Sequence, residues 1–446
     1  MQNPSKSGVS AASGGGSEQI RAAADHFGEN ASVLSAGEAS PQNPASAIDT
    51  SASDSGSESR CRGTDAACAQ NGAVFAPGRD TPHKGDTPAP PQNAGCFAGG
   101  MMILTKSGYR PIEDLEVGDE VLGGDGILRT ITRTAARTAA STLVAHVATR
   151  GKVRCTECHL FPSSANMGVG KRIDLGPPDK TRMADVAGRY LYRLDRRKIA
   201  HIEHPPLPRV EGLDDDDVIE ICGWYVGDGY IGRNKRKEPR SVVLCLNGKK
   251  LENFDRRFAG RLKYRVYMNG GLPDVSISNR DLAEFMLAEF SEYCESKRIP
   301  LWCYTLPERQ VAAFIEGYFR TDGTRDPKRG VRFTTVSPAL AYGITDMMDR
   351  SCVSLQRVKP TCTIKGRTYP QKPLYNIVRS DNPRVTHITD FGTAVRCKKI
   401  VRDLATATVY DIGTDGDGSY VANGLIAYGC ADLSCRSEGK ERQCAK

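Results

Sequence analysis

A cysteine that directly follows a glycine, at Gly95-Cys96, is well placed to attack the carbonyl of the peptide bond between them. The Cys96 thiol is the nucleophile in this arrangement, and Gly95 imposes little steric hindrance at the carbonyl. An amide is a poor acyl donor. The reaction therefore needs groups that orient the peptide, protonate the leaving nitrogen and stabilise the oxyanion.

Two copies of the pattern Gly-x5-Asp-Gly form a second candidate for chemistry. They end at Asp228-Gly229 and Asp322-Gly323, and each follows an apolar helix pattern. A single copy would be weak, because helices often end in Asp-Gly. Two copies 94 residues apart are a stronger signal than one.

The segments around these motifs resemble two protein families. Cys96 to Gly100 and Val117 to Leu122 resemble the start of an intein, and Val409 to Ile412 and Tyr420 to Ile426, followed by Cys430, resemble its end. The two Gly-x5-Asp-Gly copies resemble a LAGLIDADG (DOD-type) homing endonuclease. The resemblance covers residues 96–429. It implies an all-β, horseshoe-like Hint splicing domain, split in sequence by an inserted α+β endonuclease of two pseudo-symmetric αββαββ repeats.

The composition and the hydrophobic pattern along the chain agree with that division. Residues 1–95 are rich in Ser, Ala, Gly and Pro, which predicts a disordered flank, the N-extein of the resemblance. Short alternating runs with Gly and Asp turns predict β structure from Met101 and again from about residue 390. The expected domains are 96–205 (Hint, first half), 214–385 (endonuclease), 390–429 (Hint, second half) and 430–446 (C-terminal flank, or C-extein).

The resemblance assigns roles around Cys96. Its Thr-x-x-His motif matches Thr156 and His159, which would orient the scissile peptide and protonate its nitrogen. The same segment, Cys155 to His159, also spells C-x-x-C-H, the haem-attachment pattern. A haem or zinc site, or a buried core cysteine pair with a satisfied histidine, are therefore alternatives.

The C-terminal end departs from the intein pattern. Tyr428-Gly429 stands where a splicing intein has His-Asn, and Gly418 replaces a further histidine. Cys430 can capture a thioester, but Gly429 has no side chain that could cyclise. We expect trans-thioesterification to Cys430, an impaired C-terminal step and cleavage at Gly95-Cys96, with no cofactor needed. Asn423 lies too early to replace the missing asparagine.

For the insertion, the resemblance implies Mg²⁺ held by Asp228 and Asp322. It also implies that Lys297 assists the cleavage chemistry. The alternative for Lys297 is a solvated surface lysine without a catalytic role. Residues 221–380 contain 28 Lys and Arg against 16 Asp and Glu, a net charge of +12 that suits a phosphate-rich partner. The residues expected along the DNA major groove form a loop and a strand pattern: Arg233, Lys235, Arg236, Lys237, Arg261, Lys263 and Arg265.

The expected partner is double-stranded DNA at a host allele that lacks the intein, bound by a monomer without a membrane. Fifteen scattered cysteines, no signal peptide and no run of eighteen apolar residues favour free thiols in the cytoplasm. Two other functions stay open: an autoprocessing domain that only cleaves, which Gly429 favours, and a decayed element that only binds DNA, which the intact Asp228 and Asp322 oppose.

Overall fold

The computed structural model describes residues 95–169, 172–326, 330–348, 353–357, 361–364, 367–370, 372–379 and 386–429. The predicted N-terminal flank up to residue 94 lies outside the described residues, as do Cys430 and the C-terminal flank. Both flanks therefore stay predictions.

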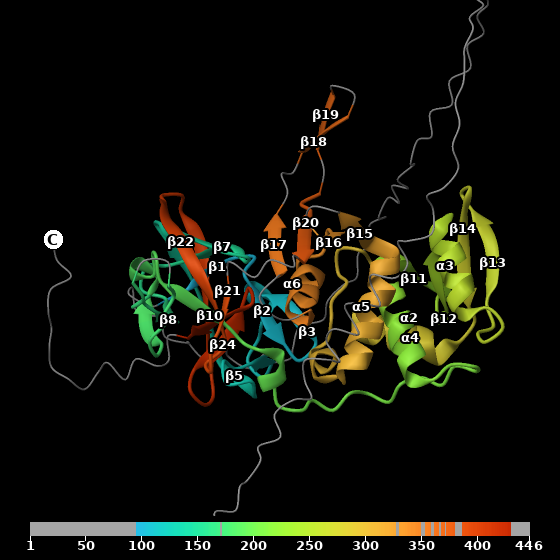
Figure 1. Cartoon of the computed structure of the whole chain (residues 1–446), viewed down its shortest axis with the longest axis horizontal. Coiled ribbons are helices and arrows are strands. Elements are labelled where there is room, and N and C mark those ends of the chain that lie inside the picture. Colours follow the sequence, from blue (N-terminus) through green and yellow to red (C-terminus); the bar gives the residue numbers. More distant parts are fainter. Residues whose placement is uncertain are drawn as a thin grey trace, which may run out of the picture. The chain divides into compact units, whose positions relative to one another are not determined.

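Strands from both sides of the insertion form one antiparallel sheet, which we call the β module (Figure 1). Its strands are β1 (Phe97–Ala98), β2 (Met102–Thr105), β3 (Gly108–Pro111), β4 (Glu120–Leu122), β5 (Leu128–Ala139), β6 (Thr142–Val147), β7 (Gly151–Cys155), β8 (Leu160–Ser164), β9 (Asp179–Arg182), β10 (Tyr190–Arg193), β21 (Thr386–Ile388), β22 (Thr393–Asp403), β23 (Ala407–Thr414), β24 (Ser419–Ala422) and β25 (Leu425–Tyr428).

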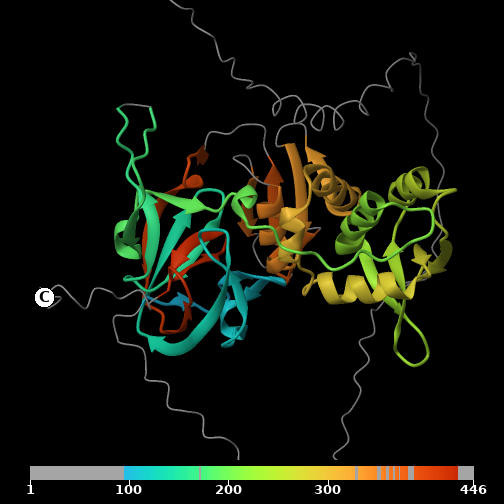
Figure 2. The ribbon, with the colours of Figure 1, turned by 90° about the horizontal axis from the view of Figure 1, so that it is seen from below.

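The two halves of the β module are interleaved. The strand β23 lies between β1 and β5, and β22 pairs with both β10 and β6. In Figure 2 the blue-green and red strands accordingly occupy the same body. Neither half can satisfy its backbone hydrogen bonds alone, so the sheet requires both. The predicted split all-β domain is confirmed.

The inserted module repeats one order of elements twice. Its first repeat contains α2 (Asp215–Asp228), β11 (Gly229–Arg233), β12 (Pro239–Cys245), α3 (Lys249–Phe258), β13 (Arg265–Asn269), β14 (Leu272–Ile277) and α4 (Arg280–Phe290). Its second contains α5 (Glu308–Asp322), β15 (Gly323–Asp326), β16 (Gly330–Thr335), α6 (Pro338–Met347), β17 (Val353–Arg357), β18 (Thr361–Ile364), β19 (Arg367–Pro370) and β20 (Tyr375–Arg379).

Each repeat folds its strands into a four-stranded antiparallel sheet, in the orders β11-β12-β14-β13 and β15-β16-β20-β17. The two orders are equivalent, as pseudo-symmetric αββαββ repeats require. The hairpin of β18 and β19 pairs separately and was not predicted.

Local sequence explains where α2 begins. Asp214 caps the helix by accepting a hydrogen bond from the Asp217 amide, and the Asp217 side chain accepts one from Asp214. The acidic run therefore forms a capping box that complements the helix dipole. No helix within the described ranges is long and apolar enough to span a membrane.

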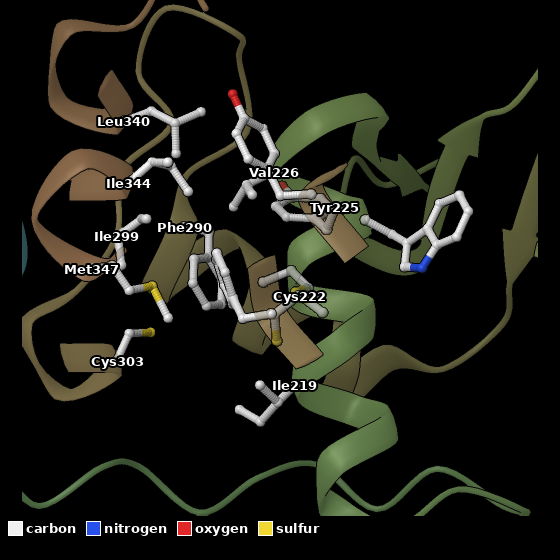
Figure 3. Packing of buried hydrophobic residues seen from close by; sticks show 14 of the residues in the cluster. Ile219, Cys222, Tyr225, Val226, Phe290, Ile299, Cys303, Leu340, Ile344 and Met347 are labelled. Atoms are coloured by element: carbon white, nitrogen blue, oxygen red, sulfur yellow. The ribbon is translucent and has the colours of Figure 1, made fainter. Parts of the chain in front are cut away.

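The core of the inserted module surrounds α2. Figure 3 shows α2 side chains directed toward Phe290 and toward the face of α6, the labelled residues being Ile219, Cys222, Tyr225, Val226, Ile299, Cys303, Leu340, Ile344 and Met347. Cys222 and Cys303 are fully buried and act there as small apolar side chains. The cysteines described in the structure with their side chains carry free thiols.

A buried charge cluster joins the two modules. Asp346, on α6, receives a hydrogen bond from the Tyr109 hydroxyl and pairs with Arg150 at 2.7 Å and Arg193 at 3.4 Å. The Arg150 side chain has no exposed surface, and that of Arg193 has 3%. Because a buried cation requires a counter-charge, this carboxylate from the insertion neutralises charge inside the β module.

We predict that Asp346→Ala lowers the free energy of unfolding by about 3–5 kcal/mol, because it leaves two buried guanidinium groups without their carboxylate. Denaturant unfolding of the whole chain measures the loss. Glu211→Ala is the matched control, since its ion pair with Lys263 is exposed on both sides and should contribute less than about 1 kcal/mol. Equal stability of the two variants would contradict the prediction.

Candidate functional site

The Gly95-Cys96 peptide lies against the segment that contains Thr156 and His159. The Cys96 amide donates to the Thr156 hydroxyl at 2.9 Å, and the Thr156 amide donates to the Cys96 carbonyl at 2.9 Å. Cys96 is 1% exposed. These two bonds fix the orientation of the peptide nitrogen, so the predicted grouping of Cys96, Thr156 and His159 exists in the fold, while their catalytic roles stay predictions.

His159 is a buried, neutral imidazole beside the scissile bond. Its ring lies 3.9 Å from that of Phe97 and 5.1 Å from that of Phe161, between centroids. Burial lowers the pKa of His159 to about 4, while the Gly95 backbone acts in the opposite direction. A Cβ added at Gly95 would lie 2.7 Å from the His159 Cα, so glycine permits this approach.

Two residues that sequence reasoning did not assign flank the Cys96 thiol. Burial raises the pKa of Cys96; a hydrogen bond and the charge of Arg137 lower it, and the Asp411 carboxylate raises it. The Asp411 side chain is fully buried and pairs with Arg133 at 2.8 Å. Asp411 falls within the Val409–Ile412 motif, which could have identified it, whereas nothing local marks Arg137.

Cys155 and Cys158 differ in their exposure to solvent. Cys155 is fully buried, but Cys158 is partly exposed, so they are not a buried core pair. Within the described residues no three His, Cys, Asp or Glu side chains are grouped to hold a metal ion. The described residues therefore supply no third ligand for a zinc ion at this segment.

The C-terminal end of the β module closes tightly around glycine. The Gly429 amide donates to the Gly418 carbonyl at 2.8 Å. A Cβ added at Gly429 would lie 2.4 Å from the Ile412 carbonyl oxygen, so a larger residue would have to displace backbone. Asn423 occupies the β24–β25 turn, where its side-chain oxygen accepts from the Met102 amide at 2.8 Å. The Asn423 side chain is thus engaged in a structural hydrogen bond, which agrees with the expectation that it does not replace the asparagine missing at position 429.

The second candidate centre lies where α2 and α5 end together. Cβ atoms added at Gly223 and Gly317 would lie 2.0 Å from the Phe314 carbonyl oxygen and 2.1 Å from that of Glu220. The helices can therefore pack closely only because both positions are glycine. Asp228 and Asp322 are the last residues of the two helices.

The carboxylate of Asp322 lies in the electrostatic field of Asp228. Burial, and then the charge of Asp228, raise the pKa of Asp322 to about 6, while Lys250 and Lys297 oppose the shift. A divalent cation would relieve this repulsion, so the donor set fits a hard metal that takes its remaining oxygen ligands elsewhere.

Two lysines accompany the carboxylates. Lys297 is 2% exposed, donates to the Gly229 carbonyl at 2.6 Å and to that of Tyr225, and lies 4.3 Å from the Tyr225 ring centroid. Burial lowers its pKa to about 8. The alternative of a solvated surface lysine is therefore wrong. Lys250, which pairs with Asp228 at 2.6 Å, was missed because α3 carries no recognisable motif there.

The basic residues expected on DNA divide into two groups. Lys235, Arg236 and Lys237 lie in the turn between β11 and β12 as predicted, and Arg233 ends β11. The predicted strand through Arg261, Lys263 and Arg265 is wrong in its first part, because β13 begins at Arg265. Arg261 instead pairs with Asp217, since the buried carboxylate needs a counter-charge.

Two family models match the chain. A Hint domain model matches residues 95–167, which include Cys96, Thr156 and His159, and a LAGLIDADG-like domain model matches residues 309–382, which include Asp322. The chain combines a Hint domain with a LAGLIDADG-like domain. The Hint domain is the β module, and the LAGLIDADG-like match covers the second repeat of the inserted module.

Relatives among known proteins include DNA polymerases of archaea. The Thermococcus hydrothermalis polymerase is 33% identical over 137 residues, which are 29% of this chain and 8% of that protein. The polymerase of Thermococcus sp. strain GE8 is 25% identical over 263 residues, 51% of this chain and 15% of that protein. The chain thus spans a small part of the length of these relatives.

Among solved structures, I-DmoI in complex with DNA and Mn is 14% identical, with a TM-score of 0.27, and the match covers 38% of this chain and 92% of that one. The gp41-1 intein is 20% identical with a TM-score of 0.17, and the match covers 22% of this chain and 68% of that one.

We predict that the stability of the chain decreases as the pH is lowered from about 6.5 toward 4, because of His159 in the Hint domain. Its pKa in the folded chain, about 4, lies below the ordinary value of 6.5, so the folded state binds fewer protons. This contribution is fully present above pH 6.5 and is lost as the pH falls toward 4, by about 3 kcal/mol. Unfolding at a series of pH values measures it, and His159→Gln should flatten the slope in that window. An unchanged slope would contradict the assignment.

Proposed function

We propose that this chain performs intein-type acyl transfer on its own backbone at the Gly95-Cys96 bond. The observation that carries the proposal is the hydrogen bond from the Cys96 amide to the Thr156 hydroxyl, with the His159 ring beside Gly95. The Cys96 sulfur attacks the Gly95 carbonyl carbon and forms a thioester, and the bond to the Cys96 nitrogen breaks.

The proton path follows from the charge of His159. With a pKa near 4 the imidazole is neutral at pH 7, so it can first accept the proton of the buried Cys96 thiol. It then donates that proton to the leaving Cys96 nitrogen, which the Thr156 hydroxyl orients. Burial of the imidazole thus favours a base that becomes an acid only during the reaction.

The residues available to consume the thioester favour cleavage of the chain over complete splicing. Cys430 is the proposed acceptor of the acyl group in trans-thioesterification. Gly429 offers no amide for cyclisation, and the Ile412 carbonyl oxygen occupies the space that a Cβ at Gly429 would need. A domain that only cleaves is therefore the second candidate function.

We predict that a small thiol splits the purified full-length chain at Gly95-Cys96, because it attacks the thioester. Intact-mass spectrometry should show residues 1–95 released as the thiol adduct and a fragment of residues 96–446. Cys96→Ala should abolish the release, and Thr156→Ala should slow it at least about tenfold.

Two results would overturn parts of this proposal. A product of residues 1–95 joined to 430–446 would show that splicing completes without an asparagine at position 429. An unchanged chain under all conditions would show that the Hint domain is inactive.

For the inserted module we propose cleavage of both strands of DNA at one specific site, with domain boundaries as expected from the sequence. Asp228 and Asp322, at the paired helix ends, would hold Mg²⁺ against the scissile phosphates. The metal would activate water and stabilise the leaving oxygen. Lys297 and Lys250 lie close enough to the carboxylates to orient them and to offset phosphate charge.

The proposed substrate is the host DNA without the insertion, bound by a monomer. The loop of Lys235, Arg236 and Lys237 and the exposed strand that begins at Arg265 supply positive charge for the phosphates. A target at the insertion site is cut only while it lacks this coding sequence, which accounts for the presence of a nuclease inside an autoprocessing domain.

We predict that the protein with Mg²⁺ linearises a plasmid in which codon 95 of the coding sequence is followed directly by codon 430. The interrupted sequence should stay intact, and a chelator should stop the reaction. Asp228→Asn or Asp322→Asn should reduce the rate at least about a hundredfold, because each removes a metal ligand. Asp281→Asn, at an exposed carboxylate of α4, is the control. Equal cleavage of both plasmids would contradict the assigned target.

A further inference from the structure

The acyl-transfer site contains a second thiol that has no role so far. The Cys158 sulfur lies 3.7 Å from the Thr156 hydroxyl, the same oxygen that accepts the Cys96 amide at 2.9 Å. A single hydroxyl group therefore separates this sulfur from the scissile peptide nitrogen. His159, the next residue, packs against Gly95 on the carbonyl side of that bond.

The two thiols differ in their access to solvent. Cys96 is 1% exposed and packs with Ala139 and Val409, so water and external thiols reach an acyl group on its sulfur less readily than one at the surface. Cys158 is partly exposed in the turn before β8. A group that moved from Cys96 to Cys158 would move from the interior to the surface.

Cys155 cannot take this part. It lies directly opposite Phe97 in the pairing of β1 with β7 and is fully buried. It is therefore the natural control, a buried thiol in the same segment, whereas Cys158 is partly exposed and its sulfur contacts the Thr156 hydroxyl.

We propose that Cys158 is a second acyl acceptor, which takes the Gly95 acyl group from Cys96 by thiol–thioester exchange. The Cys158 sulfur attacks the Gly95 carbonyl carbon and forms a new carbon–sulfur bond. The bond to the Cys96 sulfur breaks, and the proton that Cys158 loses is transferred to the Cys96 thiolate. One thioester replaces another, so the step requires no oxidant and no metal.

This inference rests on the proposed acyl transfer at Cys96 and deepens it. From Cys158 the acyl group is open to water and to small thiols, which release the segment that ends at Gly95. The relay provides an exit that bypasses Gly429, where no side chain can cyclise.

The test uses the full-length chain with Cys430→Ala, so that the downstream acceptor is absent. Acid quenching preserves thioesters, and pepsin digestion without reductant followed by mass spectrometry locates them. We expect a peptide that ends at Gly95 joined through a thioester to the peptide that contains Cys158. Adding Cys158→Ala should remove that species and slow release by a small thiol about tenfold, whereas adding Cys155→Ala should change neither.

Cys158→Ser separates chemistry from positioning, because serine keeps a hydroxyl for Thr156 but cannot form a thioester. We expect it to behave like Cys158→Ala. Release at the parental rate in Cys158→Ser would show that only the contact with Thr156 matters. A Gly95 thioester found on Cys96 alone, with unchanged release in Cys158→Ala, would overturn the relay and leave the acyl transfer standing. The absence of a Gly95 thioester on either cysteine would overturn both.

Discussion

The carboxylate of Asp346 is the contact on which the joint between the two domains depends. It comes from the inserted module, yet it compensates Arg150 and Arg193 inside the Hint domain. Loss of this carboxylate alone would leave both guanidinium groups buried without it, which costs more than the loss of a surface ion pair. The contact therefore couples the inserted module to the Hint domain in the intact chain.

The same principle shapes both candidate centres: glycine lets two backbones approach, and the approach places reactive groups together. At the paired helices, Gly223 and Gly317 let α2 and α5, which end at Asp228 and Asp322, pack closely. At the proposed acyl-transfer site, the absence of a side chain at Gly95 lets its backbone pack against His159. In both centres burial then shifts the protonation of the groups, making Asp322 easier to protonate and His159 harder to protonate.

Sequence motifs predicted the fold, because the glycines, the helix-ending aspartates and the Thr-x-x-His spacing are each readable in a short stretch of sequence. The structure places Thr156 and His159 beside Cys96, and their catalytic roles stay predictions. The remaining residues depend on tertiary contacts that no local pattern encodes. Lys250 reaches Asp228 from another helix, and Asp346 pairs with Arg150 and Arg193, which lie 196 and 153 residues earlier in the chain. Arg261 was misplaced because alternating basic residues resemble a strand, whereas the buried charge of Asp217 decides its position.

The close approach at Gly95 has a consequence for any attempt to move this domain into another protein. The residue at this position belongs to the upstream segment, yet the Hint domain shapes the space around it: a Cβ there would lie 2.7 Å from the His159 Cα. A fusion partner that ends in alanine or a larger residue would push the histidine away from the junction. As a tool for releasing fused proteins, the domain would therefore accept only cargo that ends in glycine.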